Sequence, residues 1–70
     1  MESFHATHQP IRVFALGVPE GWQAAVYDLA NHKWLDVGGW IHGTVDEAKI
    51  DARQKAEAFL GKPIPHLDWK

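Results

Sequence analysis

The chain is short, mildly acidic and free of cysteine. Its 70 residues include nine acidic and seven basic side chains, which give a formal net charge of −2. These properties indicate one small domain, exclude disulfides and thiolate metal sites, and disfavour a dedicated duplex-nucleic-acid binder, whose affinity relies on a basic excess.

The first part of the sequence predicts two strands after a loosely ordered start. Residues 1–9 show no apolar periodicity, and we expect them to be flexible. From residue 10 to 16 the side chains alternate as in a strand, and both sets are largely apolar. Residues 17–21, GVPEG, predict a turn because Pro19 presets its φ angle and the glycines accept positive φ. A second strand follows from about 22 to 29.

A third strand is predicted over about residues 33–40. It follows a segment of turn-forming residues that includes Asn31, which tolerates left-handed backbone. Short connections between successive strands imply an antiparallel meander of two hairpins. The Gly38–Gly39 pair predicts a bulge or bend, because GGWIHG lacks both the Gly-Lys-Ser/Thr of a Walker A loop and the spacing of a dinucleotide fingerprint.

A helix is predicted from Thr44 to Leu60. Thr44 and Glu47 have the spacing of a capping box, in which side chains satisfy the first backbone N–H groups. Gly61 and Pro63 end the helix. The apolar stripe at helical spacing consists of Val45, Ala48, Ala52, Ala56, Phe59 and Leu60.

These elements predict an α+β fold of order β-β-β-α. A three-stranded antiparallel meander is followed by one C-terminal helix packed on one face and by an extended tail. We interpret residues 1–70 as a single domain, with a core over 10–60 and a tail over 61–70 anchored by Trp69. The small residues of the helix bring it close to the sheet, so the sheet supplies the bulk. The candidates for that bulk are Trp22, Val26, Leu35 and Val37.

One helix covers one face of the sheet and leaves the other face to solvent, to the tail or to a partner. An exposed aromatic cluster on such a face usually marks an interaction surface. The alternative is that the N-terminal segment and the tail fold back over it. The candidate interaction surface consists of Phe14, Tyr27, Trp34 and Trp40 on the uncovered face, with Ile50 on the outer side of the helix.

Groups that could support catalysis or metal binding are sparse. Ser3 is the only serine, and the two threonines are Thr7 and Thr44, of which Thr44 is explained as a helix cap. A chain this short can hardly enclose a typical pocket of roughly 300 Å³ or more. His5 and His8 form an HxxH pair, but no second pair is placed to complete a zinc site. We therefore predict no enzyme activity, no cofactor and no metal.

The capped helix start after an aromatic strand resembles a known family. Thr44, Glu47 and Ala48, preceded by the strand WQAAVYD, resemble the HicB-like antitoxin domains. The order of three strands and one helix is also similar to the arm-type DNA-binding domain of phage integrases. Both resemblances cover about residues 11–60 and imply this topology, a bacterial or phage origin and a binding role. HicB-like antitoxins normally carry a further DNA-binding segment and integrase arm domains are more basic, so no functional residue is carried over.

The sequence therefore predicts a small non-enzymatic binding module. Its partner is a protein or a second copy of the chain, bound through the uncovered sheet face or an edge strand. The start lacks the features of a signal peptide and no apolar run approaches ~18 residues, so a cytoplasmic protein without membrane contact is expected. The alternative is a nucleic-acid-binding accessory domain that uses the sheet aromatics with Arg12, Lys33, Lys49 and Arg53.

Overall fold

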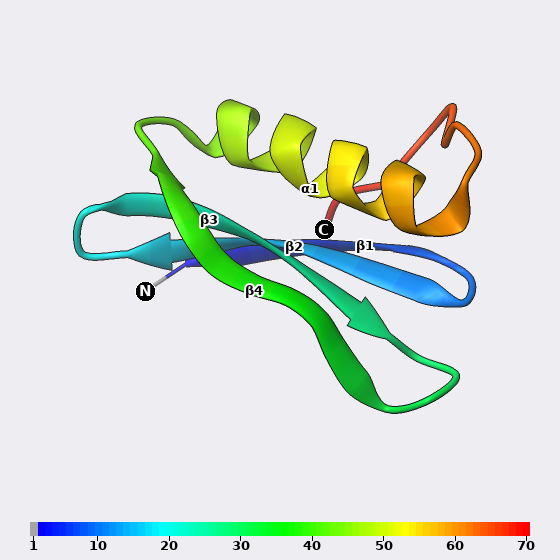
Figure 1. Cartoon of the computed structure of the whole chain (residues 1–70). Helices are drawn as coiled ribbons and strands as arrows, with labels where there is room; N and C mark the ends of the chain where they lie inside the picture. The colour runs from blue at the N-terminus through cyan, green and yellow to red at the C-terminus, as the bar shows by residue number, and fades with distance from the viewer. Residues whose placement is uncertain (1) are drawn as a thin grey trace.

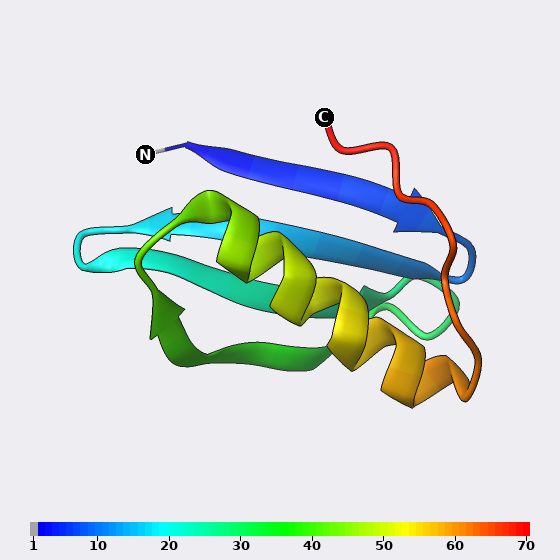
Figure 2. The ribbon, with the colours of Figure 1, turned by 90° about the horizontal axis from the view of Figure 1, so that it is seen from above.

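The structure, a computed structural model, describes residues 2–70, which form an antiparallel sheet with a helix across one face (Figures 1 and 2). This arrangement confirms the α+β class with a C-terminal helix. Within residues 2–70 the sheet has four strands rather than the three predicted. The elements are β1 (Ser3–His8), β2 (Ile11–Val18), β3 (Gly21–Asp28), β4 (Lys33–His42) and α1 (Val45–Leu60), and the strands are ordered β1-β2-β3-β4.

The additional strand, β1, lies in the segment that was predicted to be flexible. It pairs antiparallel with β2 from Ser3 opposite Leu16 to His8 opposite Ile11. Ala6 is its only fully buried apolar residue among those described. Such a strand has too few apolar side chains to produce a periodic signal. Its order comes from backbone pairing with β2, which a sequence pattern does not report.

The turn between β2 and β3 confirms the prediction made from GVPEG. Pro19 and Glu20 form the turn, and Gly21 begins β3 with a φ of 153°. A Cβ at Gly21 would collide with the backbone carbonyl oxygen of His42 on β4. Glycine is therefore required here by a close approach of two strands as well as by its φ angle.

The turn between β3 and β4 is held by the buried carboxylate of Asp28. This side chain accepts hydrogen bonds from the Asn31 side-chain amide at 2.7 Å and from the backbone N–H groups of Ala30 and Asn31. The Asn31 amide above all, then these N–H groups and the charge of Lys33, hold the pKa of Asp28 below its ordinary value, although burial opposes them. The left-handed residue of this turn is His32, with a φ of 55°, rather than Asn31.

Helix α1 begins and ends where the sequence predicted. The Thr44 hydroxyl accepts a hydrogen bond from the Glu47 backbone N–H at 3.2 Å and donates one to the Glu47 carboxylate. Gly61 adopts the left-handed conformation, and its N–H donates to the Glu57 carbonyl oxygen at 2.8 Å. Within residues 2–70, no helix is long and apolar enough to cross a membrane.

The core lies between α1 and the face of the sheet that it covers, which we call the covered face. Val26 and Leu35 contribute bulk there, as predicted. Val37 does not, because it lies on the opposite face and is 57% exposed, and Phe59 is also exposed rather than part of the buried helix stripe. Trp22 packs at the rim against the Phe4 ring, with 5.8 Å between ring centroids. The core cluster consists of Ala6, Ile11, Val13, Ala24, Val26, Ala52, Ala56 and Ile64.

The C-terminal tail closes the side of the molecule where β1 lies (Figure 2). Ile64 is fully buried in the core, and its N–H donates to the Glu57 carboxylate at 2.8 Å. Lys70 and His5 exchange two backbone hydrogen bonds of 2.8 and 3.1 Å. Trp69 packs against the core, which confirms it as the anchor of the tail. The tail therefore lies along β1 and beside the helix.

Candidate functional site

Two irregularities in β4 decide which side chains reach each face of the sheet. Tyr27 lies opposite Trp34 and Val26 opposite Asp36, so Leu35 is an extra residue in β4. A second irregularity places residues 38–40 opposite a single residue of β3. Gly39 has a φ of 84° within it, which confirms the predicted bulge.

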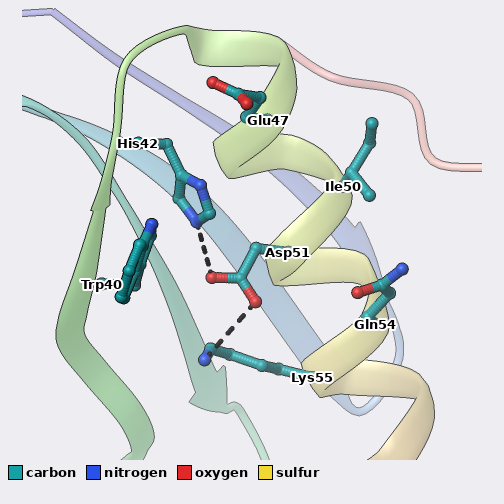
Figure 3. A pocket seen from close by; sticks show the side chains of 7 residues that line it. All are labelled: Trp40, His42, Glu47, Ile50, Asp51, Gln54 and Lys55. Atoms are coloured by element: carbon teal, nitrogen blue, oxygen red, sulfur yellow. Dashed lines mark hydrogen bonds and ion pairs between the residues drawn. The ribbon is translucent and has the colours of Figure 1, made fainter.

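These irregularities replace simple alternation along β4. Trp34, Val37 and Ile41, at spacings of three and four, lie on the face away from α1, which we call the open face. Trp40 was predicted on this face, but it lies on the helix side, where it lines a groove with residues of α1 (Figure 3). The extra residue Leu35 is the cause, because it reverses the alternation that follows Trp34, whereas the residues inserted at 38–40 leave Val37 and Ile41 on the same face.

The open face carries a continuous row of rings that crosses the sheet. His5, Phe14, Trp34 and Tyr27 follow one another with ring centroids 6.2, 5.2 and 4.9 Å apart. We call these four residues the aromatic row. Phe14 and Trp34 meet across β3, where Ala25 lies on the same face and is fully buried. Three predicted surface residues, Phe14, Tyr27 and Trp34, are thus brought together.

The open face also exposes apolar side chains of β4 and carries little formal charge. Trp34 is 49% exposed, Val37 57% and Ile41 41%, so these side chains form one exposed strip along β4. Arg12 is the only formally charged side chain that the register places on the open face of the described strands, and it donates to the Thr7 hydroxyl. The open face therefore combines exposed apolar area with very little charge.

A second candidate site is an open groove between the end of β4 and α1 (Figure 3). Its volume is about 450 Å³. Trp40 stands at one wall with 75% of its side chain exposed, and Ile50 stands on the helix with 57% exposed. We call this the edge groove, and its lining residues are Trp40, His42, Glu47, Ile50, Asp51, Gln54 and Lys55.

A chain of charged contacts joins the walls of the edge groove. His42 Nε2 lies 2.8 Å from Asp51 Oδ2, which links the last residue of β4 to the helix. Asp51 Oδ1 lies 3.5 Å from Lys55 Nζ, an i,i+4 pair along the helix. Lys55 Nζ also lies 3.5 Å from Asp36 Oδ2 on β4. These contacts fix the distance between β4 and α1 and give the edge groove a defined shape.

The edge groove contains a histidine–aspartate pair but lacks the other parts of a hydrolytic site. Its lining includes no hydroxyl or thiol side chain among the residues that the structure describes. No group of three or more metal-ligating side chains is assembled within residues 2–70. The edge groove therefore presents an exposed indole on β4 beside a helix, with the His42–Asp51 contact between them.

The four basic residues of the nucleic-acid alternative do not share a surface. Arg12 lies on the open face, whereas the Lys49 ammonium lies over the Phe4 and Trp69 rings on the helix side, 4.7 and 5.4 Å from their centroids. Arg53 pairs with Glu57 along the helix at 3.5 Å. Lys33 opens β4 opposite Asp28. These cations therefore do not form a continuous basic stripe.

Sequence reasoning missed several residues of the two surfaces, among them Val37, Ile41, His42 and Asp51. Val37 and Ile41 were missed because strict alternation was continued from Trp34 past Leu35, the extra residue in β4, and no sequence signal marks that irregularity. The pair of His42 and Asp51 was missed because the two residues belong to different elements, β4 and α1. A sequence pattern within one strand or one helix does not indicate a contact between two elements.

Comparisons of the chain with protein-family models, with curated proteins and with solved structures found no match. The resemblance to HicB-like antitoxin domains therefore stays a prediction.

Proposed function

We propose that the chain is a non-enzymatic binding module that associates with a second copy of itself through the open face. The observation that supports this most is the aromatic row together with the exposed strip that flanks it. Trp34 belongs to both features, since it contacts Phe14 and Tyr27 and keeps about half of its surface exposed. Aromatic residues at the centre of an apolar patch are the usual anchors of protein interfaces.

The low charge of the open face favours a second copy over a partner of opposite charge. In a two-fold interface each patch meets itself, so like charges near the axis repel. The open face avoids this, because Arg12 is its only formal charge in the described strands and lies near the turn that joins β1 to β2. A small domain also gains stability from burying such a face, since its own core supplies only a few kcal/mol.

Binding of single-stranded nucleic acid is the alternative for the same face. That function uses rings whose flat faces are free to stack on bases, beside a basic track. Here Tyr27 and Trp34 pack edge to face at 76° and the rings contact one another. The net charge of −2 and the scattered cations also favour the protein partner.

Sedimentation velocity over a range of concentrations tests the proposal with two tryptophan variants. The wild-type chain is expected to show a concentration-dependent dimer. Trp34→Ala removes an anchor from the open face and is expected to weaken dimerisation about tenfold or more. Trp40→Ala is the matched control, since it removes an even more exposed tryptophan from outside the face.

The proposal fails if the wild-type chain stays monomeric at high concentration, or if both variants weaken the dimer equally. A titration with single-stranded DNA and RNA at low salt covers the alternative. Salt-dependent shifts of the ring protons of Phe14, Tyr27 and Trp34 in a monomeric chain would favour nucleic acid instead.

A further inference from the structure

We propose that the edge groove is a second binding site, which takes an extended peptide segment of another protein. The peptide pairs with the outer edge of β4. It places an apolar side chain against Trp40 and Ile50 and a basic side chain toward Glu47. This site lies on the helix side of the sheet, so it is separate from the open face and does not rest on the self-association proposed above.

The first observation is that β4 is an edge strand beside a groove. The sheet order β1-β2-β3-β4 leaves the outer side of β4 without a neighbouring strand in residues 2–70. After the bulge, Ile41 and His42 pair with β3 on their inner side. Their outer backbone groups can therefore pair with an added strand, the mode in which backbone bonds give affinity and nearby pockets give specificity.

The second observation is the apolar surface of the edge groove. Trp40 on β4 and Ile50 on α1 are 75% and 57% exposed and line the groove at its two sides, with His42 and Asp51 between them (Figure 3). A volume of about 450 Å³ that is open to one side suits one or two peptide side chains. An exposed tryptophan at such a wall is the residue type most enriched among binding hot spots.

The third observation is the charge of the lining. Among the lining residues, the carboxylates Glu47 and Asp51 stand beside a single lysine, Lys55. Asp51 is already engaged by His42 and Lys55 at 2.8 and 3.5 Å. The Glu47 carboxylate accepts from the Thr44 hydroxyl at 3.2 Å and stands at the mouth of the groove. A basic side chain of the peptide complements this acid, and an acidic peptide is disfavoured.

The test is a selection of random linear seven-residue peptides on the intact chain. Selection on the Trp40→Ala chain is the background. We expect enriched peptides to carry one basic residue and an apolar residue at alternate positions. A synthetic copy of the most enriched peptide is then measured by titration calorimetry against the wild-type chain and three variants.

The expected losses of affinity separate the three contacts. Trp40→Ala weakens binding about tenfold or more, and Glu47→Gln weakens it about two- to fivefold, since it removes one exposed charge pair but keeps a side chain that suits the helix cap. N-methylation of alternate peptide amides abolishes binding, because it removes the donors of the added strand. Trp34→Ala, on the open face, is the control and leaves the affinity unchanged.

Three outcomes would overturn the proposal. The first is no enrichment over the Trp40→Ala background. The second is a selected peptide whose affinity is the same for the Glu47→Gln chain as for the wild-type chain and is also unchanged when its alternate amides are N-methylated. The third is a dimer that persists in Trp34→Ala and is lost in Trp40→Ala, because a second copy would then occupy the edge of β4.

Discussion

The two faces of the sheet differ in how closely their side chains are packed. On the covered face, alanines of the helix meet alanines and valines of the strands, and the contact residues Ala24, Ala52 and Ala56 are at most 1% exposed. On the open face the large rings of Phe14 and Trp34 meet, and Trp34 keeps about half of its surface exposed. The covered face achieves close packing, whereas the open face holds apolar area that the chain itself does not bury.

This difference teaches where the chain tolerates change. A surface of small residues at van der Waals contact cannot accept added atoms, because the helix would have to move away from the sheet. A surface of half-exposed large residues loses little folding energy on truncation but loses the contacts that a partner would use. Substitutions on the two faces therefore affect different measurements.

The largest effect is expected from enlarging the covered face. Ala52→Leu adds a branched side chain to a fully buried position on α1 and is expected to lower the free energy of unfolding by about 3 kcal/mol. Ala58→Leu, on the exposed side of the same helix, is the matched control and is expected to change it by less than about 0.5 kcal/mol. Urea unfolding of both variants measures the contrast, and equal losses would show that the covered face is loosely packed.

A valine-to-alanine substitution on each face compares the contributions of the two faces to stability. Val26→Ala leaves a cavity beneath the helix and is expected to lower the free energy of unfolding by about 2 kcal/mol. Val37 lies on the next strand and is 57% exposed. Val37→Ala is expected to lower the free energy of unfolding of the monomer by less than about 0.5 kcal/mol. Thermal and urea unfolding at low protein concentration compare the two. A large loss at Val37 alone would mean that the open face is buried in the folded species.

The second irregularity of β4, at residues 38–40, can be tested at Gly39. With a φ of 84°, Gly39→Ala is strained even though nothing lies within 4 Å of the added carbon. We expect a loss of about 1 kcal/mol in the free energy of unfolding. Gly43→Ala, nearby and without a positive φ, is the control. An unchanged stability of Gly39→Ala would indicate that the backbone here adopts another conformation.

The smallest effect concerns pH and the turn at the end of the covered face. The pKa of Asp28 is lowered in the folded chain, so its contribution to stability is fully present above the ordinary aspartate value of about 3.9 and is lost as the pH falls through the lowered pKa. Asp28→Asn is expected to flatten the dependence of stability on pH in this acidic range. Urea unfolding between about pH 2 and 6 measures it, and Glu20→Gln in the other turn is the control. The same slope in Asp28→Asn and the wild-type chain would contradict this assignment.

The sequence predicted those parts of the fold that depend on local chemistry. The cap at Thr44, the stop at Gly61 and the buried alanines of α1 follow from neighbouring residues, and the structure confirms them. The strand β1 was missed because its order comes from pairing with β2. Local patterns therefore located the helix and three strands, and missed a strand whose support is a partner strand.

The candidate surface was predicted in part for a related reason. Phe14 and Tyr27 lie in regular strands, where alternation assigns faces correctly. Trp34 reaches the open face as predicted, but the bulges after it move Val37 onto that face and Trp40 away from it. One extra residue reverses every later assignment in a strand. The edge groove also depends on how α1 crosses the sheet, which no strand pattern contains.

The backbone pairing of Lys70 with His5 limits the stoichiometry of any assembly built through sheet edges. A sheet with two free edges can add neighbours on both sides and grow without end, as fibres do. Here the tail engages the β1 edge at His5, and the outer side of β4 is the remaining edge within residues 2–70. An added strand is therefore expected at β4 rather than at His5. The tail obstructs growth of the sheet from both edges at once.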